Sequence, residues 1–113
     1  MLLVHHRGRK SGRENLTPMM YLPDEHRPDT VYVFASKAGA PTNPAWYHNL
    51  TTAGTAVVER DTDTYTVTVE EVTGEERDRI YAEQARRYPG FAGYAEKTAG
   101  IRTIPVLALH RSR

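Results

Sequence analysis

The sequence contains no cysteine among its 113 residues, which excludes disulfide bonds and thiolate chemistry and makes a cytoplasmic setting the default expectation. It also has no apolar run long enough to span a membrane, and Met1-Leu2-Leu3-Val4 is too short for the core of a signal peptide. The formal charge at pH 7 is only +1, so the composition gives no reason to expect nucleic-acid binding. Any electrostatic function must therefore come from local clusters of charge.

Several catalytic patterns are missing as well. The five histidines are scattered along the chain, and no two lie four residues apart on an expected helix beside a third ligand, so we expect no metal site. The chain has neither a Gly-x-Ser-x-Gly elbow nor a Gly-x-Gly-x-x-Gly fingerprint. What remains is a set of cations and hydrogen-bond donors, with an aromatic stripe at Tyr88, Phe91 and Tyr94. Such a set is typical of sites in which a bound cofactor carries the chemistry.

The length and the balance of residue types predict one globular domain over residues 1–113. Hydrophobic residues make up 39% of the chain and charged residues 26%, as in ordinary soluble proteins. A chain of this length can bury a single core but not two.

A strand, a loop and a helix follow one another in the centre of the chain. The apolar run 31–35 predicts a strand with both faces at least partly covered. Asn43 is a candidate helix cap and Pro44 suits the first helical position, so that free N–H groups and Lys37 would converge on one spot that favours an anion or a polarised oxygen. The alternative is an ordinary helix start in which Trp46 serves as a core anchor.

Two features near the N-terminus point to the same kind of ligand. Residues 7–13 carry four positive side chains, two glycines and no acid, which suits a phosphate site or, alternatively, a solvated hairpin turn. The following strand, residues 15–22, is interrupted by Pro18, which indicates an edge, a bulge or a gap where something else docks.

The rest of the chain predicts a hairpin, two helices and a last strand. Residues 55–59 and 65–69 flank a turn, with Tyr65, Val67 and Val69 on the core side. Thr73 and Glu76 match a capping box for a helix that buries Ile80, Tyr81 and Gln84 and exposes Arg77; Pro89-Gly90 separates it from a second helix, and residues 103–109 form the last strand. The fold class is therefore mainly β (α+β), with about six antiparallel strands in a barrel and helices outside it or across its mouth.

Seven segments resemble, in order and spacing, the deazaflavin-dependent nitroreductase family of actinobacteria, and together they span essentially the whole chain. The most specific are Gly8-Arg9-Lys10-Ser11-Gly12 and Asn43-Pro44-Ala45-Trp46-Tyr47-His48-Asn49-Leu50; the others are residues 17–21, 35–39, 73–77, 88–89 and 102–106. The resemblance implies a split β-barrel, related to flavin-binding barrels and to F420H2-dependent quinone reductases, that uses coenzyme F420.

Carried over by position, the resemblance implies a set of site residues. The cofactor-binding residues would be Arg9, Lys10, Ser11, Asn15, Leu16, Thr17, Pro18, Met19, Met20, Phe34, Ala35, Ser36, Lys37, Ala45, Trp46, Tyr47, His48, Asn49 and Phe91. Arg9, Lys10 and Ser11 would hold the phosphate side of the cofactor. Ser36 and Tyr94 are the candidate catalytic residues, because a hydroxyl can donate to an anionic oxygen and then relay a proton. Met20, Tyr88 and Phe91 are the candidate substrate-binding residues.

The implied reaction is hydride transfer from reduced F420 to a quinone, a nitro compound or an activated alkene. A non-catalytic F420 or flavin carrier, and an FMN-dependent oxidoreductase on the same barrel, stay open as alternatives. The expected partner is a small-molecule acceptor; a homodimer and membrane association through a lipophilic acceptor also stay open.

Three departures from the family pattern are visible. Relatives usually carry a helical segment before the first strand, which is absent from this sequence; either a more open pocket or a shortened chain would follow. Phe91 stands where relatives often have a tyrosine, so it can stack but cannot donate a proton. The turn at residues 25–28 is longer than usual.

Overall fold

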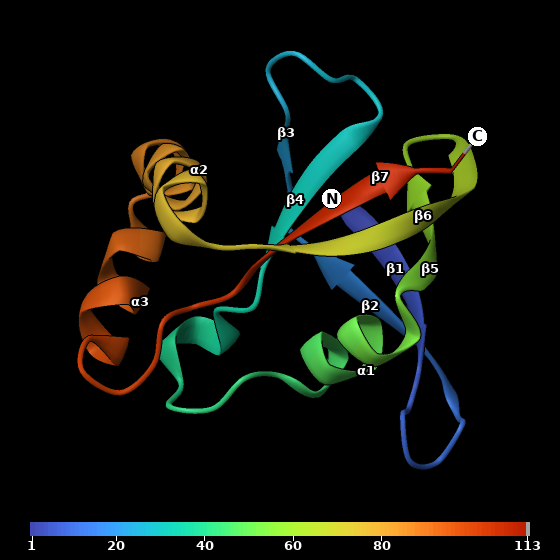
Figure 1. Ribbon diagram of the computed structural model, residues 1–113, viewed down its shortest axis with the longest axis horizontal. Coiled ribbons are helices and arrows are strands. Elements are labelled where there is room, and N and C mark those ends of the chain that lie inside the picture. Colours follow the sequence, from blue (N-terminus) through green and yellow to red (C-terminus); the bar gives the residue numbers. More distant parts are fainter. Residues whose placement is uncertain (113) are drawn as a thin grey trace.

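Seven antiparallel strands form one curled sheet in the computed structural model, which describes residues 1–112 (Figure 1). The strands are β1 (Leu2–Arg7), β2 (Glu14–Met19), β3 (Leu22–Pro23), β4 (Thr30–Phe34), β5 (Thr55–Arg60), β6 (Asp63–Val72) and β7 (Val106–Arg111). Their order across the sheet is β2-β1-β5-β6-β7-β4-β3, so β2 and β3 are the two edges. The predicted split barrel is confirmed, with one strand more than expected, because the segment read as a single second strand bends after Met19 and divides into β2 and β3.

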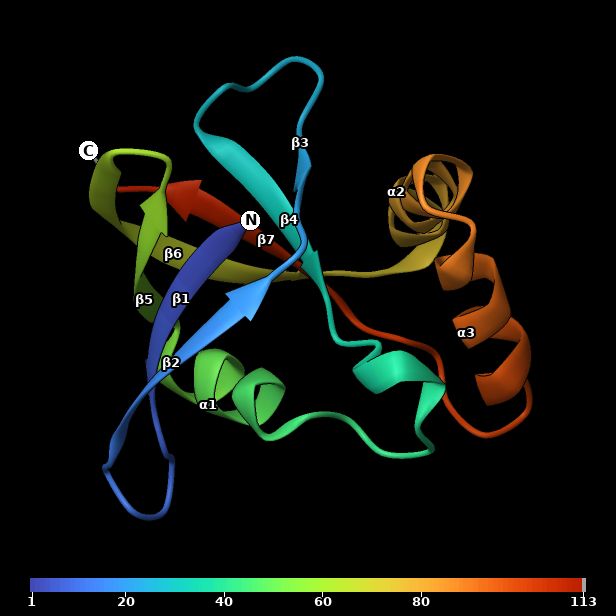
Figure 2. The same ribbon diagram turned by 180° about the vertical axis from the view of Figure 1, so that it is seen from behind.

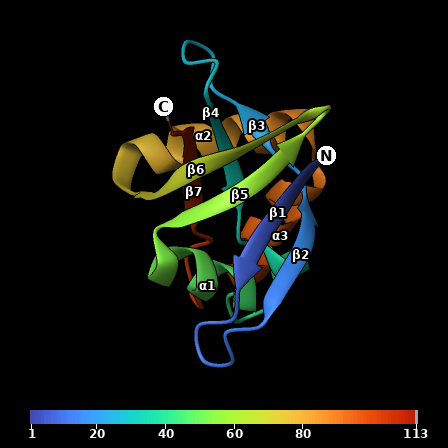
Figure 3. The same cartoon turned by 90° about the vertical axis from the view of Figure 1, so that its right-hand side faces the viewer.

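Three α-helices and a short 3-10 helix complete the fold. They are the 3-10 helix η1 (Lys37–Gly39), α1 (Ala45–Ala53), α2 (Gly74–Arg87) and α3 (Gly90–Thr98). Helix α1 lies across one end of the curled sheet, whereas α2 and α3 lie together beside β4 and β3 (Figures 2 and 3). Within residues 1–112, no helix is long and apolar enough to cross a membrane.

Strand β4, next to the edge strand β3, divides its side chains between two hydrophobic cores. Val31 and Val33 join the core inside the curled sheet, and Tyr32 and Phe34 join the core between the sheet and the helices α2 and α3. Every residue of β4 is buried, as the continuous apolar run predicted. Burial of one such side chain contributes about 1.5–3 kcal/mol, so this strand fixes the position of the loop that follows it.

Both predicted helix caps are wrong. Helix α1 has Pro44 in its cap position, and the side-chain oxygen of Asn43 instead accepts a hydrogen bond from Nη1 of Arg102 at 2.7 Å. Thr73 does occupy the cap position of α2, but its side chain makes no capping bond, and Gly74 has a left-handed φ of +67° that turns the first residue of the helix out of helical geometry. The acceptor that should have capped α1 is used for a long-range contact.

The expected orientation of α2 is confirmed for its apolar face and wrong for Arg77. Ile80, Tyr81 and Gln84 are buried against the second core. The side chain of Arg77 is only 15% exposed, and its Nε and Nη2 donate to the carbonyl oxygen of Ile104 at 3.1 and 2.9 Å. Arg77 therefore fastens α2 to the segment that leads into β7.

Candidate functional site

A cavity of about 240 Å³ lies where the edge strand β2 ends, between the loop after β4 and the helices α1 and α3. Within residues 1–112, strand β2 has no partner strand on its outer side, so the wall of the barrel is interrupted here, as expected from Pro18. The cavity lining comprises Pro18, Met19, Met20, Phe34, Ser36, Lys37, Ala38, Trp46, Phe91 and Tyr94. All of these except Ala38 are residues that the sequence predicted for the site.

The loop after β4 has an unusual backbone. Lys37, Ala38 and Gly39 have positive φ values of 47°, 52° and 81° in succession. Such a conformation is uncommon outside glycine, and at Gly39 a Cβ atom would lie 3.1 Å from Cδ of Lys97 on α3. The ammonium of Lys97 also contacts the carbonyl oxygen of Ala38 at 3.4 Å. The loop is therefore packed directly against the helix that carries Phe91 and Tyr94.

Arg102 holds this loop through hydrogen bonds of its guanidinium and was not predicted as a site residue. Its guanidinium donates to the carbonyl oxygens of Ala35 (3.1 Å), Ser36 (2.9 Å) and Ala40 (3.0 Å), in addition to Asn43. All four acceptors are neutral, and burial lowers the pKa of Arg102. The only signal in the sequence was that Arg102 falls within a segment shared with the family, which gave no role to its side chain.

The aromatic residues of α3 form one wall of the cavity. The ring of Phe91 meets those of Phe34 and Tyr94 edge-on, at centroid distances of 5.7 and 5.2 Å. The backbone of Phe91 is fixed by the hydroxyl of Tyr81, which donates to its carbonyl oxygen at 2.7 Å. Tyr88, by contrast, is 44% exposed and does not line the cavity, so the structure does not bring it to the acceptor site expected for it.

The cationic turn joins β1 to β2 and forms a closed loop. The N–H of Gly8 donates to the carbonyl of Arg13, and that of Gly12 donates to the carbonyl of Gly8, both at 2.8 Å. Arg9, Lys10 and Ser11 are exposed, and Ser11 Oγ accepts a hydrogen bond from the N–H of Arg13 at 3.2 Å. Within residues 1–112, neither Arg9 nor Lys10 forms a side-chain ion pair, so both cations are available to an anionic ligand.

The remaining predicted residues lie near the cavity in the sequence but do not line it. These are Asn15, Leu16 and Thr17 on β2, Ala35 after β4, and Ala45, Tyr47, His48 and Asn49 on α1. The hydroxyl of Tyr47 donates to Glu71 at 2.7 Å, and burial together with that carboxylate raises the pKa of Tyr47 to about 12. Asn49 is buried, and its amide is engaged within the protein.

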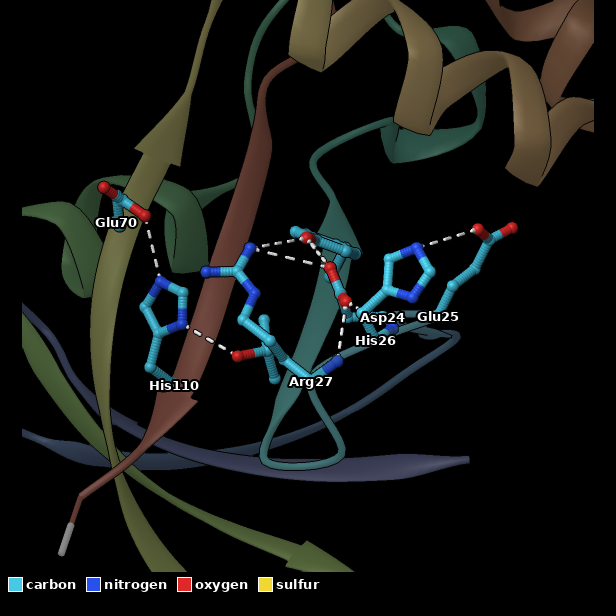
Figure 4. A network of polar contacts seen from close by, with 8 residues as sticks. Asp24, Glu25, His26, Arg27, Glu70 and His110 are labelled. Atoms are coloured by element: carbon cyan, nitrogen blue, oxygen red, sulfur yellow. Dashed lines mark hydrogen bonds and ion pairs between the residues drawn. The ribbon is translucent and has the colours of Figure 1, made fainter.

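A second polar network lies at the opposite end of β4, in the turn that precedes Thr30 (Figure 4). Asp24 accepts hydrogen bonds from the Tyr32 hydroxyl and from the backbone N–H groups of His26 and Arg27. Burial raises the pKa of Asp24, but these hydrogen bonds outweigh it and hold the pKa well below its usual value. The long turn is thus ordered by its own carboxylate, and no group of three or more potential metal ligands is present within residues 1–112.

Comparison with known proteins shows the family to which the chain belongs. Residues 1–111 match the sequence profile of the family described as F420H(2)-dependent quinone reductase. Rv3178 of Mycobacterium tuberculosis (strain ATCC 25618 / H37Rv), provisionally assigned as an F420H(2)-dependent quinone reductase, is 32% identical over 108 residues, covering 96% of this chain and 87% of that protein.

Two solved structures have a similar fold. An F420-H2 dependent reductase (FDR-A) aligns with a TM-score of 0.81 and 31% identity, covering 96% of this chain and 92% of that one. A protein described as a domain-swapped dimer aligns with a TM-score of 0.82 and 31% identity, over 96% of this chain and 78% of that one. The sequence match, the relative and the shared half-barrel agree with the resemblance drawn from the motifs, and this chain is a member of the F420H(2)-dependent quinone reductase family.

Proposed function

We propose that this protein binds coenzyme F420 and reduces a quinone with the hydride of the reduced coenzyme. The observation that carries the proposal is the cavity at the interrupted barrel wall, where an apolar and aromatic lining meets two hydroxyl groups and one lysine. Family membership supports the choice of coenzyme and of a quinone as acceptor.

The donor set fits a phosphorylated ring cofactor. Met19, Phe34 and Trp46 offer flat or adaptable apolar surface to a ring, and the turn with Arg9 and Lys10 offers uncompensated positive charge to a phosphate. Strand β2 connects these two regions, since the turn precedes its first residue and the cavity adjoins its last. The five steps between the six residues of β2 span about 16 Å, which suits a ligand whose ring and phosphate are separated by a chain.

The residues around the cavity then have separate tasks. When bound, the reduced deazaflavin supplies the hydride. The hydroxyls of Ser36 and Tyr94 donate hydrogen bonds to the acceptor oxygen, stabilise the negative charge that develops on it and pass a proton to it. Lys37, whose Nζ lies 3.3 Å from the Thr42 hydroxyl, keeps a positive charge at the mouth. Met20, which is 38% exposed, and Phe91 shape the acceptor side.

The proposal is tested by mixing the purified protein with reduced F420 and menadione. We expect F420 to bind and the reduced coenzyme to be oxidised, whereas FMN should bind more weakly and support no turnover. Tight binding without oxidation would favour a carrier, and a preference for FMN would overturn the choice of coenzyme. Nitro compounds and activated alkenes tested in the same assay decide whether the acceptor range extends beyond quinones.

Variants of the two hydroxyls test their roles. Positioned general acids contribute on the order of 10²–10⁴-fold, so Tyr94→Phe and Ser36→Ala should each lower kcat by about tenfold or more while changing F420 affinity little. Tyr65→Phe, on β6 and outside the cavity, serves as the matched control. A normal kcat in both variants would remove these residues from the reaction.

We further propose a homodimer formed through the outer face of β2, β1 and β5. Leu16 and Val57 are 53% and 38% exposed on this face and lie on either side of His5 in the strand register. The similar protein described as a domain-swapped dimer supports self-association. Sedimentation equilibrium should give twice the chain mass, and Leu16→Glu should return the protein to a monomer.

We also propose a cytoplasmic location with membrane association through a lipophilic quinone, which cell fractionation tests.

A further inference from the structure

A chain of three hydrogen bonds runs from the cationic turn through α1 to β2. The backbone N–H of Arg9 donates to Oδ1 of Asn49 at 3.0 Å. Nδ2 of Asn49 lies 3.0 Å from Nδ1 of His6, and Nε2 of His6 lies 2.8 Å from Oγ1 of Thr17. His6 and Asn49 are only 8% and 7% exposed, so these contacts are shielded from water.

The backbone N–H of Arg9 determines which group donates and which accepts in each of these three hydrogen bonds. A backbone N–H can only donate, so the atom of Asn49 that faces it must be the oxygen, and the amide nitrogen must face His6. That nitrogen also can only donate, which makes Nδ1 of His6 the acceptor. His6 is therefore neutral with its proton on Nε2, from which it donates to Thr17. Burial lowers the pKa of His6, in agreement with this neutral form.

The contact with Asn49 is what ties the tip of the turn to another element. The other hydrogen bonds of residues 8–13 stay within the turn or reach Asn15 next to it, as far as residues 1–112 are concerned. Asn49 stands one helical turn after Trp46, which lines the cavity. The same helix therefore fixes both the turn and one wall of the cavity.

We propose that His6 and Asn49 are positioning residues for the phosphate-binding turn, which they hold through the backbone of Arg9 without contacting the ligand. This rests on the proposed function for the identity of the ligand. The Asn49 side chain is buried, and its oxygen and its nitrogen each have a partner within the protein, so in this proposal the residue acts through the turn. Its effect on binding should therefore depend on the phosphate and not on the ring.

The first experiment uses the ligand-free protein and so does not depend on F420. In wild-type protein we expect the Arg9 amide to exchange slowly with solvent and the long-range ¹H–¹⁵N spectrum of His6 to show the neutral Nε2–H form. Asn49→Leu, similar in size but without polar atoms, should accelerate Arg9 exchange at least tenfold. His5→Gln is the matched control, because His5 contacts Glu59 and Glu14 and, within residues 1–112, no residue of the turn 8–13. Unchanged Arg9 exchange in folded Asn49→Leu, or a charged or Nδ1–H His6 at pH 7, would overturn the proposal.

The second experiment compares two ligands, F420 and its phosphate-free deazaflavin fragment with the ribityl chain. Asn49→Leu should weaken F420 binding about tenfold and leave the affinity of the fragment within twofold. His6→Phe should behave in the same way, and His5→Gln should leave both affinities unchanged. Equal weakening of both ligands would contradict the positioning role. If wild-type protein binds neither ligand, the proposed function fails, and the exchange experiment alone decides whether His6 and Asn49 hold the turn.

Discussion

Replacing Arg102 by methionine should destabilise the protein and loosen the loop between β4 and α1. Methionine retains most of the aliphatic stem but removes the guanidinium and its bonds to three carbonyl groups and to Asn43. A lost hydrogen bond costs about 1 kcal/mol, which gives an upper bound of about 4 kcal/mol if no acceptor finds a new partner.

Solvent access lowers that bound. Arg102 also lines a second cavity of about 390 Å³ near the end of α3, through which water can reach some of the freed acceptors. We therefore expect a loss of about 2–3 kcal/mol in the free energy of unfolding. The positive φ values at Lys37 and Ala38 add to the effect, because residues in such conformations persist only where the surroundings hold them.

Urea unfolding measures this loss. Trp46 is the only tryptophan in the chain and lines the first cavity, so its fluorescence reports on the site as well as on the fold. Arg102→Lys should recover less than half of the stability, because one ammonium cannot reach four acceptors spread over residues 35–43. Arg86→Met is the control, since Arg86 makes an exposed ion pair with Glu83 and should leave the midpoint unchanged. A loss below about 0.5 kcal/mol in Arg102→Met would refute the holding role.

Three further predictions concern other parts of the fold. Gln84 is fully buried, and neither of its side-chain polar atoms has a partner within residues 1–112, so Gln84→Met should raise the free energy of unfolding by about 1–3 kcal/mol. If urea unfolding instead shows a lower free energy of unfolding in the variant, the amide of Gln84 has hydrogen-bond partners. Burial lowers the pKa of His6, so the unfolded chain binds the proton more tightly than the folded protein does. The free energy of unfolding should therefore be highest above pH 6.5 and fall as the pH drops from 6.5 toward the pKa of the folded protein. This fall should be smaller in His6→Gln, and an equal dependence of stability on pH in both proteins would contradict the assignment. Lys37→Ala should raise the dissociation constant of F420 more than it lowers kcat, with Arg79→Ala on α2 as control, and an unchanged constant would remove Lys37 from the cofactor site.

The elements of this fold could be predicted where a single local pattern decides them. The continuous apolar run of β4 and the alternation of β6 both led to the right strands, because each pattern reflects which faces are covered. The predicted cap of α1 failed because the Asn43 side chain binds another partner, Arg102, 59 residues further along the chain. No local pattern contains that competitor. The capping bond of α2 is missing where Gly74 has a left-handed φ of +67°.

The residues that line the candidate cavity could be predicted where local patterns located their strands and helices. Residues such as Ser36, Trp46 and Tyr94 line one cavity because they sit at the ends of strands and on helices that the motifs located correctly. The motifs could not distinguish a residue that lines the cavity from one that holds a neighbouring segment. Asn49 lies outside the cavity lining and contacts Arg9 and His6, so its role as a cofactor contact stays a prediction, and Arg102 received no role.

The cationic turn and the loop after β4 are each held by a side chain that belongs to another segment, the buried Asn49 for the turn and the half-buried Arg102 for the loop. Asn49 lies 40 residues from Arg9, and Arg102 lies 67 residues from Ala35. The exposed cations Arg9, Lys10 and Lys37 supply charge, but long flexible side chains bind weakly unless their backbone is already in place. Substitutions at the holding residues should therefore reduce cofactor affinity without removing any ligand contact, and surface substitutions beside the cations should not. We expect the affinity of this site to depend on preorganisation set by distant residues as much as on the residues that carry the charge.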